Sequence, residues 1–158
     1  MDYDKAAYNR LSDLLKIDPE YLDEDICMHA DSYFHVSEGA VYHKAVRDKA
    51  KHDLELEMAT LDRDIRDAAA ANEEKLTEPG IKMQTLREPD YQRALDKHLR
   101  ASHEAAKWDA LQESFKQRSY MLGHLNDINN RRMYNETGGI SNRTRGEASE
   151  RVNARRRD

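Results

Sequence analysis

The chain has 158 residues, of which 38% are hydrophobic and 36% are charged, and its mean hydropathy is −1.03. The charged share is high and the hydrophobic share low for a globular domain, which favours exposed helices over a thick core. Only 6 glycines and 3 prolines are present, too few for the turns of an all-β design. We therefore expect one all-α domain without the run of about 20 apolar residues that a membrane span needs.

The net charge of −5 is unevenly distributed along the chain. From Arg131 onward there are eight arginines and four acids, so this segment carries +4 and the remainder −9. The asymmetry predicts an acidic folded body with a basic, flexible tail that binds anions. A solvated tail without a binding role would have the same composition.

Cysteine content and the N-terminal segment limit the cellular context. No apolar stretch of signal-peptide length occurs at the N-terminus, so we expect a soluble, cytoplasmic protein. Cys27 is the single cysteine, which excludes an internal disulfide. Its simplest role is that of a small core residue.

The first segment, residues 1–18, is predicted to contain a short amphipathic helix. Its apolar positions are Leu11, Leu14, Leu15 and Ile17. Asp18 and Pro19 then mark a helix start, with Asp18 as the cap and Pro19 at the first helical position. Further along, Gly39 is expected to mark a kink or a helix junction.

Residues 19–129 are expected to form a helical hairpin that serves as an oligomerisation core. The two arms cover residues 40–75 and 91–129, and a connector over residues 76–90 separates them. Each arm would reach roughly 55 to 60 Å at the rise of an α-helix.

The connector is defined by two helix breakers, Pro79 and Pro89. Between them, residues 81–86 are predicted to form a turn or so of helix. Asp90 is a good cap for the second arm.

Both arms carry an apolar seam. In the first arm the spacing alternates between four and three residues, which is the heptad pattern of a coiled coil. These residues are Leu54, Met58, Leu61, Ile65 and Ala68. The comparable stripe of the second arm begins with Tyr91, Leu95, Leu99, Ser102 and Ala106 and leads to Trp108, Leu111, Phe115, Arg118, Leu122 and Leu125.

Antiparallel pairing of the two seams gives the predicted fold class. It is all-α: a long, coiled-coil-like antiparallel helical hairpin with a short N-terminal helix and a flexible basic C-terminal tail over residues 130–158. A seam this narrow buries too little surface by itself. We therefore expect a homo-oligomer, closed and ring-like.

Catalytic and metal chemistry find little support in the sequence. Asp31 with His35, and Asp48 with His52, lie one helical turn apart and invite a metal hypothesis. A di-iron bundle, however, needs Glu three residues before His, and none of the seven histidines has an acid there. No phosphate-binding loop or nucleophile motif occurs. We expect no enzymatic activity, no catalytic residue, no metal and no cofactor.

Basic residues are the remaining candidates for a binding site, since contacts with nucleic-acid phosphates need no base recognition. An oligomer would add together the weak phosphate contacts of its subunits. The candidates are Arg63, Arg66, Lys75 and Lys82 near the hairpin tip, Lys107, Lys116 and Arg118 along the second arm, and Arg131, Arg132, Arg143, Arg145, Arg155, Arg156 and Arg157 in the tail. The alternative for any one of them is an ion pair with an acid on a neighbouring helix.

A family resemblance adds to these patterns. Residues 75–125 combine a polar connector, a long arm carrying Trp108 and Leu111, and a Lys-x-Arg-Ser-aromatic stretch from Lys116 to Tyr120. This arrangement resembles the corresponding half of phage UvsY-type recombination mediators. The similarity in layout extends over roughly residues 22–128.

The resemblance implies a non-enzymatic helper of DNA recombination and repair that acts in a bacterial host cell. Members of this bacteriophage family form ring-like oligomers, bind single-stranded DNA and help to load a RecA-type recombinase onto strands coated by single-strand-binding protein. Their basic stretch near the end of the first arm corresponds here to Arg63, Arg66 and Lys75, which are mixed with several acids. The arginine-rich tail could supply the missing charge.

A second interpretation, of another class, stays open. A phage structural or scaffolding coiled-coil protein, whose tail docks an acidic protein partner, would show the same seams.

Overall fold

The computed structural model describes the backbone of residues 3–155 and the side chains of residues 3–134. It contains helix α1 (Lys5–Asp13), the 3-10 helix η1 (Pro19–Tyr21), and helices α2 (Leu22–Ala71), α3 (Glu78–Arg87) and α4 (Pro89–Arg155). No strand occurs among the described residues. The predicted all-α hairpin with a short N-terminal helix is confirmed.

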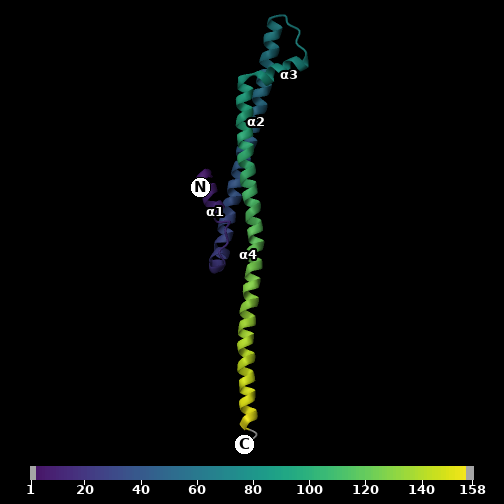
Figure 1. Ribbon diagram of the computed structural model, residues 1–158. Helices are drawn as coiled ribbons and strands as arrows, with labels where there is room; N and C mark the ends of the chain where they lie inside the picture. The colour runs from purple at the N-terminus through teal and green to yellow at the C-terminus, as the bar shows by residue number, and fades with distance from the viewer. Residues whose placement is uncertain (1–2, 156–158) are drawn as a thin grey trace.

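The molecule is a thin rod (Figure 1). Helices α2 and α4 run antiparallel and make most of the contacts between elements, α3 lies across the tip between them, and α1 lies along the lower part of α2. Beyond the start of α2, α4 continues with no other described helix beside it. At about 1.5 Å per residue, its 67 residues span about 100 Å.

Helix starts follow the local capping chemistry. The side chain of Asp4 accepts a hydrogen bond from the Ala7 amide, that of Asp18 from the Glu20 amide, and that of Thr77 from the Gly80 amide. Helix α4 begins at Pro89, whose fixed φ suits a first helical position. The prediction that Asp90 caps this helix was wrong, because Asp90 lies inside the first turn.

The first arm is longer than predicted, because α2 already begins at Leu22 and passes through Gly39 without a break. The reason is the close approach of Trp108 from α4. A Cβ built on Gly39 would lie 2.3 Å from a carbon of the Trp108 ring. Gly39 is therefore a packing position and not a helix junction.

The core surrounds Trp108 at the level of α1. Its buried residues come from three helices and are Ala7, Leu11, Val36, Ala40, Trp108, Leu111 and Phe115. The rings of Tyr3 and Tyr8 meet Trp108 edge-on with centroids 5.8 and 5.5 Å away, and His43 stacks on it at 5.3 Å. The N-terminal helix thus supplies the third layer that the hairpin alone would lack.

The seam loosens toward the tip. Leu54, Leu61 and Ile65 are half-buried, whereas Met58 is 47% exposed. In the second arm, Leu122 is buried and Leu125 half-buried. The prediction that Cys27 is a core residue was wrong, because it lies exposed on α2.

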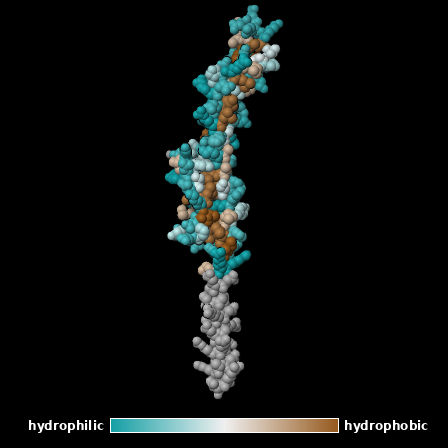
Figure 2. Space-filling model, in the orientation of Figure 1, coloured by the Kyte–Doolittle hydropathy of each residue, from teal (hydrophilic) through white to brown (hydrophobic). Residues whose placement is uncertain are grey.

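Hydrophobic side chains form a narrow, interrupted line along the rod on the face shown in Figure 2, with hydrophilic side chains on both sides. None of the described helices has an apolar stretch that could cross a lipid bilayer. Most residues of the predicted flexible tail, 130–158, have side chains outside the described part of the structure. The flexibility of this tail therefore stays a prediction.

The substitution Gly39→Ala should destabilise the fold. The new methyl group would collide with Trp108, and overpacking of this kind costs about 1 to 3 kcal/mol, more than the gain of about 1 kcal/mol from better helix propensity. Gly123→Ala in α4 is the control, since a Cβ there meets nothing within 4 Å. Urea unfolding followed by circular dichroism should show lower stability for Gly39→Ala and unchanged or higher stability for Gly123→Ala. Equal effects would contradict the packing role.

Candidate nucleic-acid interface

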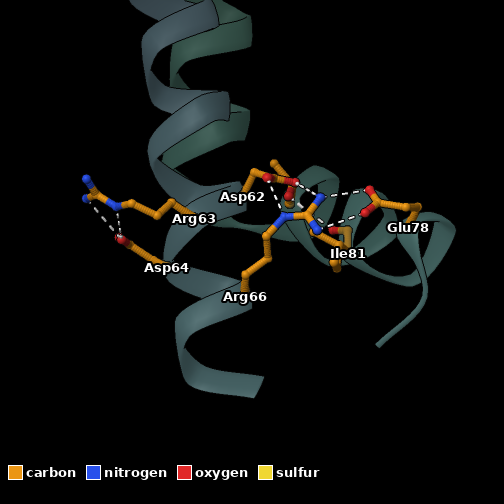
Figure 3. A network of polar contacts seen from close by, with 7 residues as sticks. Asp62, Arg63, Asp64, Arg66, Glu78 and Ile81 are labelled. Atoms are coloured by element: carbon orange, nitrogen blue, oxygen red, sulfur yellow. Dashed lines mark hydrogen bonds and ion pairs between the residues drawn. The ribbon is translucent and has the colours of Figure 1, made fainter. Parts of the chain in front are cut away.

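Arg66, at the hairpin tip, is engaged within the protein. Arg66 donates from Nη2 to Glu78 of α3 at 2.7 Å and from Nε to Asp62 of α2 at 2.8 Å (Figure 3). The hydrogen bonds with Glu78 and then Asp62 raise the pKa of Arg66, and the bond with Arg66 lowers the pKa of Glu78. Arg66 therefore ties α3 to α2 and has little capacity left for a phosphate.

The remaining tip residues do not form a positive surface either. Arg63 pairs with Asp64 at 3.3 Å, and residues 62–88 contain seven acids against five lysines and arginines. Lys75 and Lys82 are exposed and form no ion pair with any described residue. The tip holds a cavity of about 650 Å³ whose lining includes Asp62, Glu78 and Lys82. An acidic setting of this kind opposes phosphate binding.

Arg118, predicted as a seam residue and as a phosphate contact, is buried where α4 meets the start of α2 and the segment between α1 and η1. Its Nη2 donates to the Asp25 carboxylate at 2.5 Å and to the Lys16 carbonyl at 3.5 Å, and its Nη1 lies 3.2 Å from Nδ1 of His29. The side chain is only 5% exposed. The phosphate role predicted for Arg118 was wrong, because the guanidinium joins the start of α2 to α4.

The surroundings of His29, which include Arg118, shift its pKa. Its ring stacks on Tyr33 at 6.1 Å and on Phe115 at 5.9 Å. Burial, and secondarily the positive charge of Arg118, lowers the pKa of His29. A neutral ring is thus favoured, which leaves Nδ1 able to accept from Arg118.

A shallow hollow of about 320 Å³ lies between α2 and α4 beside this junction. Its lining is aromatic and basic and consists of His29, Ala30, Tyr33, Lys116, Ser119 and Tyr120. Lys116 is held by Glu113 at 3.0 Å, and Lys107 by Glu104 at 3.0 Å, so neither is a fully free cation. Tyr120 is 79% exposed and therefore presents its ring to solvent.

From this hollow, one side of α4 leads into the basic segment. Arg131 follows Tyr120 by eleven residues and Tyr134 follows it by fourteen, so all three lie on one side of the helix. All three are exposed, as is Arg132. The other predicted tail contacts, Arg143, Arg145, Arg155, Arg156 and Arg157, have side chains outside the described part. Interleaved aromatic and basic residues are typical of surfaces that bind single-stranded nucleic acid.

Within the described part of the chain, no group of three His, Cys, Asp or Glu side chains could hold a metal ion. Asp31 and His35 do approach to 3.8 Å, but this is a pair and not a ligand set.

The chain matches no protein-family model, and comparison with curated proteins and with solved structures finds no similar protein. The resemblance to UvsY-type mediators therefore stays an expectation.

The sequence did not reveal that Tyr120, Arg131 and Tyr134 share a face, although their spacing contains the signal. The predicted arm ended at residue 129, which separated Tyr120 from the basic residues that the continuous α4 places on its side.

Lowering the pH from 7.5 to 5.5 should destabilise the protein through His29. Because its pKa is below 6.5 in the folded state, the unfolded chain binds the proton more readily, and the free energy of unfolding falls as the pH drops below 6.5. In thermal unfolding, His29→Gln should lose less stability over this range than the unsubstituted protein. His103→Gln, at an exposed position of α4, is the control and should behave like the unsubstituted protein. An identical pH dependence for His29→Gln would contradict the assignment.

Proposed function

We propose that this protein is a non-enzymatic mediator of DNA recombination that self-associates and binds single-stranded DNA. The observation that carries the proposal is the separation of charge along the rod: an acidic helical bundle in which Arg66 and Arg118 are paired, and a projecting α4 whose far segment is basic. DNA contact is assigned to α4 from Tyr120 onward and to the arginines that follow.

Single strands fit this surface better than duplex DNA. Exposed bases can stack on Tyr120 and in the hollow beside Tyr33, while Arg131, Arg132 and the later arginines neutralise phosphates. One helix offers few such contacts, but joined copies would add theirs along one strand. The family resemblance extends the proposal to loading of a RecA-type recombinase onto strands coated by single-strand-binding protein.

Arg131→Gln with Arg132→Gln should weaken binding to a fluorescent oligo-dT strand. Removal of two phosphate contacts per chain should reduce the slope of log affinity against log salt by about 1 to 2. The matched control is Lys75→Gln with Lys82→Gln, which removes the same charge at the acidic tip and should leave the slope unchanged. Anisotropy titrations between low and moderate salt give both slopes. A loss confined to the tip variant would move the site to the tip.

Tyr120→Ala should weaken the same binding through lost stacking. The expected cost is about 1 to 3 kcal/mol with an unchanged salt slope, because the change removes no charge. Tyr21→Ala, at an exposed tyrosine outside the hollow, should have no effect. If the full chain binds no single strand even at low salt, the mediator proposal fails. The long rod would then favour the alternative, a structural or scaffolding coiled-coil protein.

A further inference from the structure

Helix α2 has a second apolar stripe on the side opposite its core face. Cys27, Phe34 and Val41 follow one another at intervals of seven residues, which is two helical turns, and Phe34 and Val41 are 57% and 66% exposed. Val36 is fully buried and lies about 200° around the helix axis from Phe34. The stripe therefore faces away from α4.

The surface around this stripe is concave. A hollow of about 380 Å³ is lined by Tyr3, Phe34, Ser37, Glu38, Val41 and Tyr42. Large side chains on a helix with a hollow beside them match the knobs and holes of helix pairing. No described element of the same chain covers Phe34 or Val41.

The charges along α2 indicate what would cover the stripe, although Asp25 and Lys44 face α4 and pair there with Arg118 and Asp109. Residues 20–38 contain six acids and no lysine or arginine, whereas residues 44–51 contain four lysines and arginines and one acid. Phe34 and Val41 lie where the acidic part gives way to the basic part. A second α2 in antiparallel orientation would place each acidic part against the basic part of the other copy, while a parallel one would oppose like charges.

We propose that two copies of this chain pair through α2 in antiparallel orientation, with the two-fold axis between Phe34 and Val41. Phe34 of each copy then faces Val41 of the second copy. Glu24 comes close to Lys49 of the second copy, and neither of them forms an ion pair with a described residue of its own chain. In an antiparallel pair with two-fold symmetry, each edge of α2 lies against the same edge of the second copy. Glu24 and Lys49 lie on the same edge of α2, so Glu24 of one copy can approach Lys49 of the other.

This inference rests on the self-association in the proposed function and specifies the surface that performs it. It concerns no DNA contact, so pairing is measured without DNA. If the protein pairs as described but binds no DNA, the pairing stands and the mediator proposal fails. If it binds DNA but does not pair through α2, the mediator proposal stands and the pairing fails.

Cysteine crosslinking tests the orientation. In the proposed pair Cys27 lies opposite position 48 of the second copy, while the two Cys27 residues are about 31 Å apart, too far for a direct link. Asp48→Cys should therefore give a covalent dimer with a short bismaleimide reagent, and the unsubstituted protein should give none. Ala59→Cys, which is exposed on the same helix but out of register, is the control and should give none. A dimer from the unsubstituted protein would indicate parallel pairing, and no dimer from Asp48→Cys would overturn the proposal.

Light scattering tests the stripe itself. Phe34→Lys should raise the dissociation constant of the dimer roughly tenfold or more, since the side chain is central to the contact. Leu99→Lys on α4 alters an apolar side chain of nearly the same exposure, 58%, and should leave the dimer intact. Circular dichroism checks that both variants remain helical. An unchanged mass for Phe34→Lys, or equal dissociation of both variants, would refute the interface.

Discussion

The contact between the Trp108 ring and the backbone of Gly39 sets the distance between the two long helices. A side chain at position 39 would force the helices apart, since the space of its Cβ is already filled by ring carbons. Around this contact the tyrosines and leucines of the N-terminal segment close the core, so that α1 becomes part of the bundle. A hairpin with a thin seam thereby gains one segment of three-layer packing. Outside it, the two helices are joined by half-buried leucines and by cross-helix ion pairs such as Lys44 with Asp109 and Lys97 with Asp53.

The distribution of ion pairs decides which cations can serve a ligand. An arginine between two carboxylates, such as Arg66, or one buried against Asp25, such as Arg118, contributes to the joints between helices. The bundle is also acidic overall, so its remaining lysines act in a negative field. The far part of α4 projects past α2 and carries the positive excess of the chain. The rod thus consists of an acidic helical bundle and a basic extension of α4.

The same helix α2 serves two surfaces. One side is built into the core through Val36 and Ala40, and the opposite side presents Phe34 and Val41. A helix with apolar residues on two sides has more hydrophobic surface than one hairpin can bury. The change from acidic to basic residues along α2 favours one relative orientation of two paired copies. An apolar stripe alone would not distinguish parallel from antiparallel pairing.

The sequence by itself determined the helical class, the approximate position of the connector and the seam around Trp108, because helix periodicity, proline breakers and capping residues act over a few positions. Pro89 and Thr77 illustrate this local control. Tertiary structure alone decided the role of Gly39, whose neighbour Trp108 lies on the other arm and cannot be inferred from local propensity. It also decided that Arg118 is buried and that Cys27 is exposed, since a periodic pattern does not say which partners meet across a seam. The basic face of α4 depended on both: the spacing of its residues is local, but its projection past the start of α2 follows from the tertiary arrangement of the two helices.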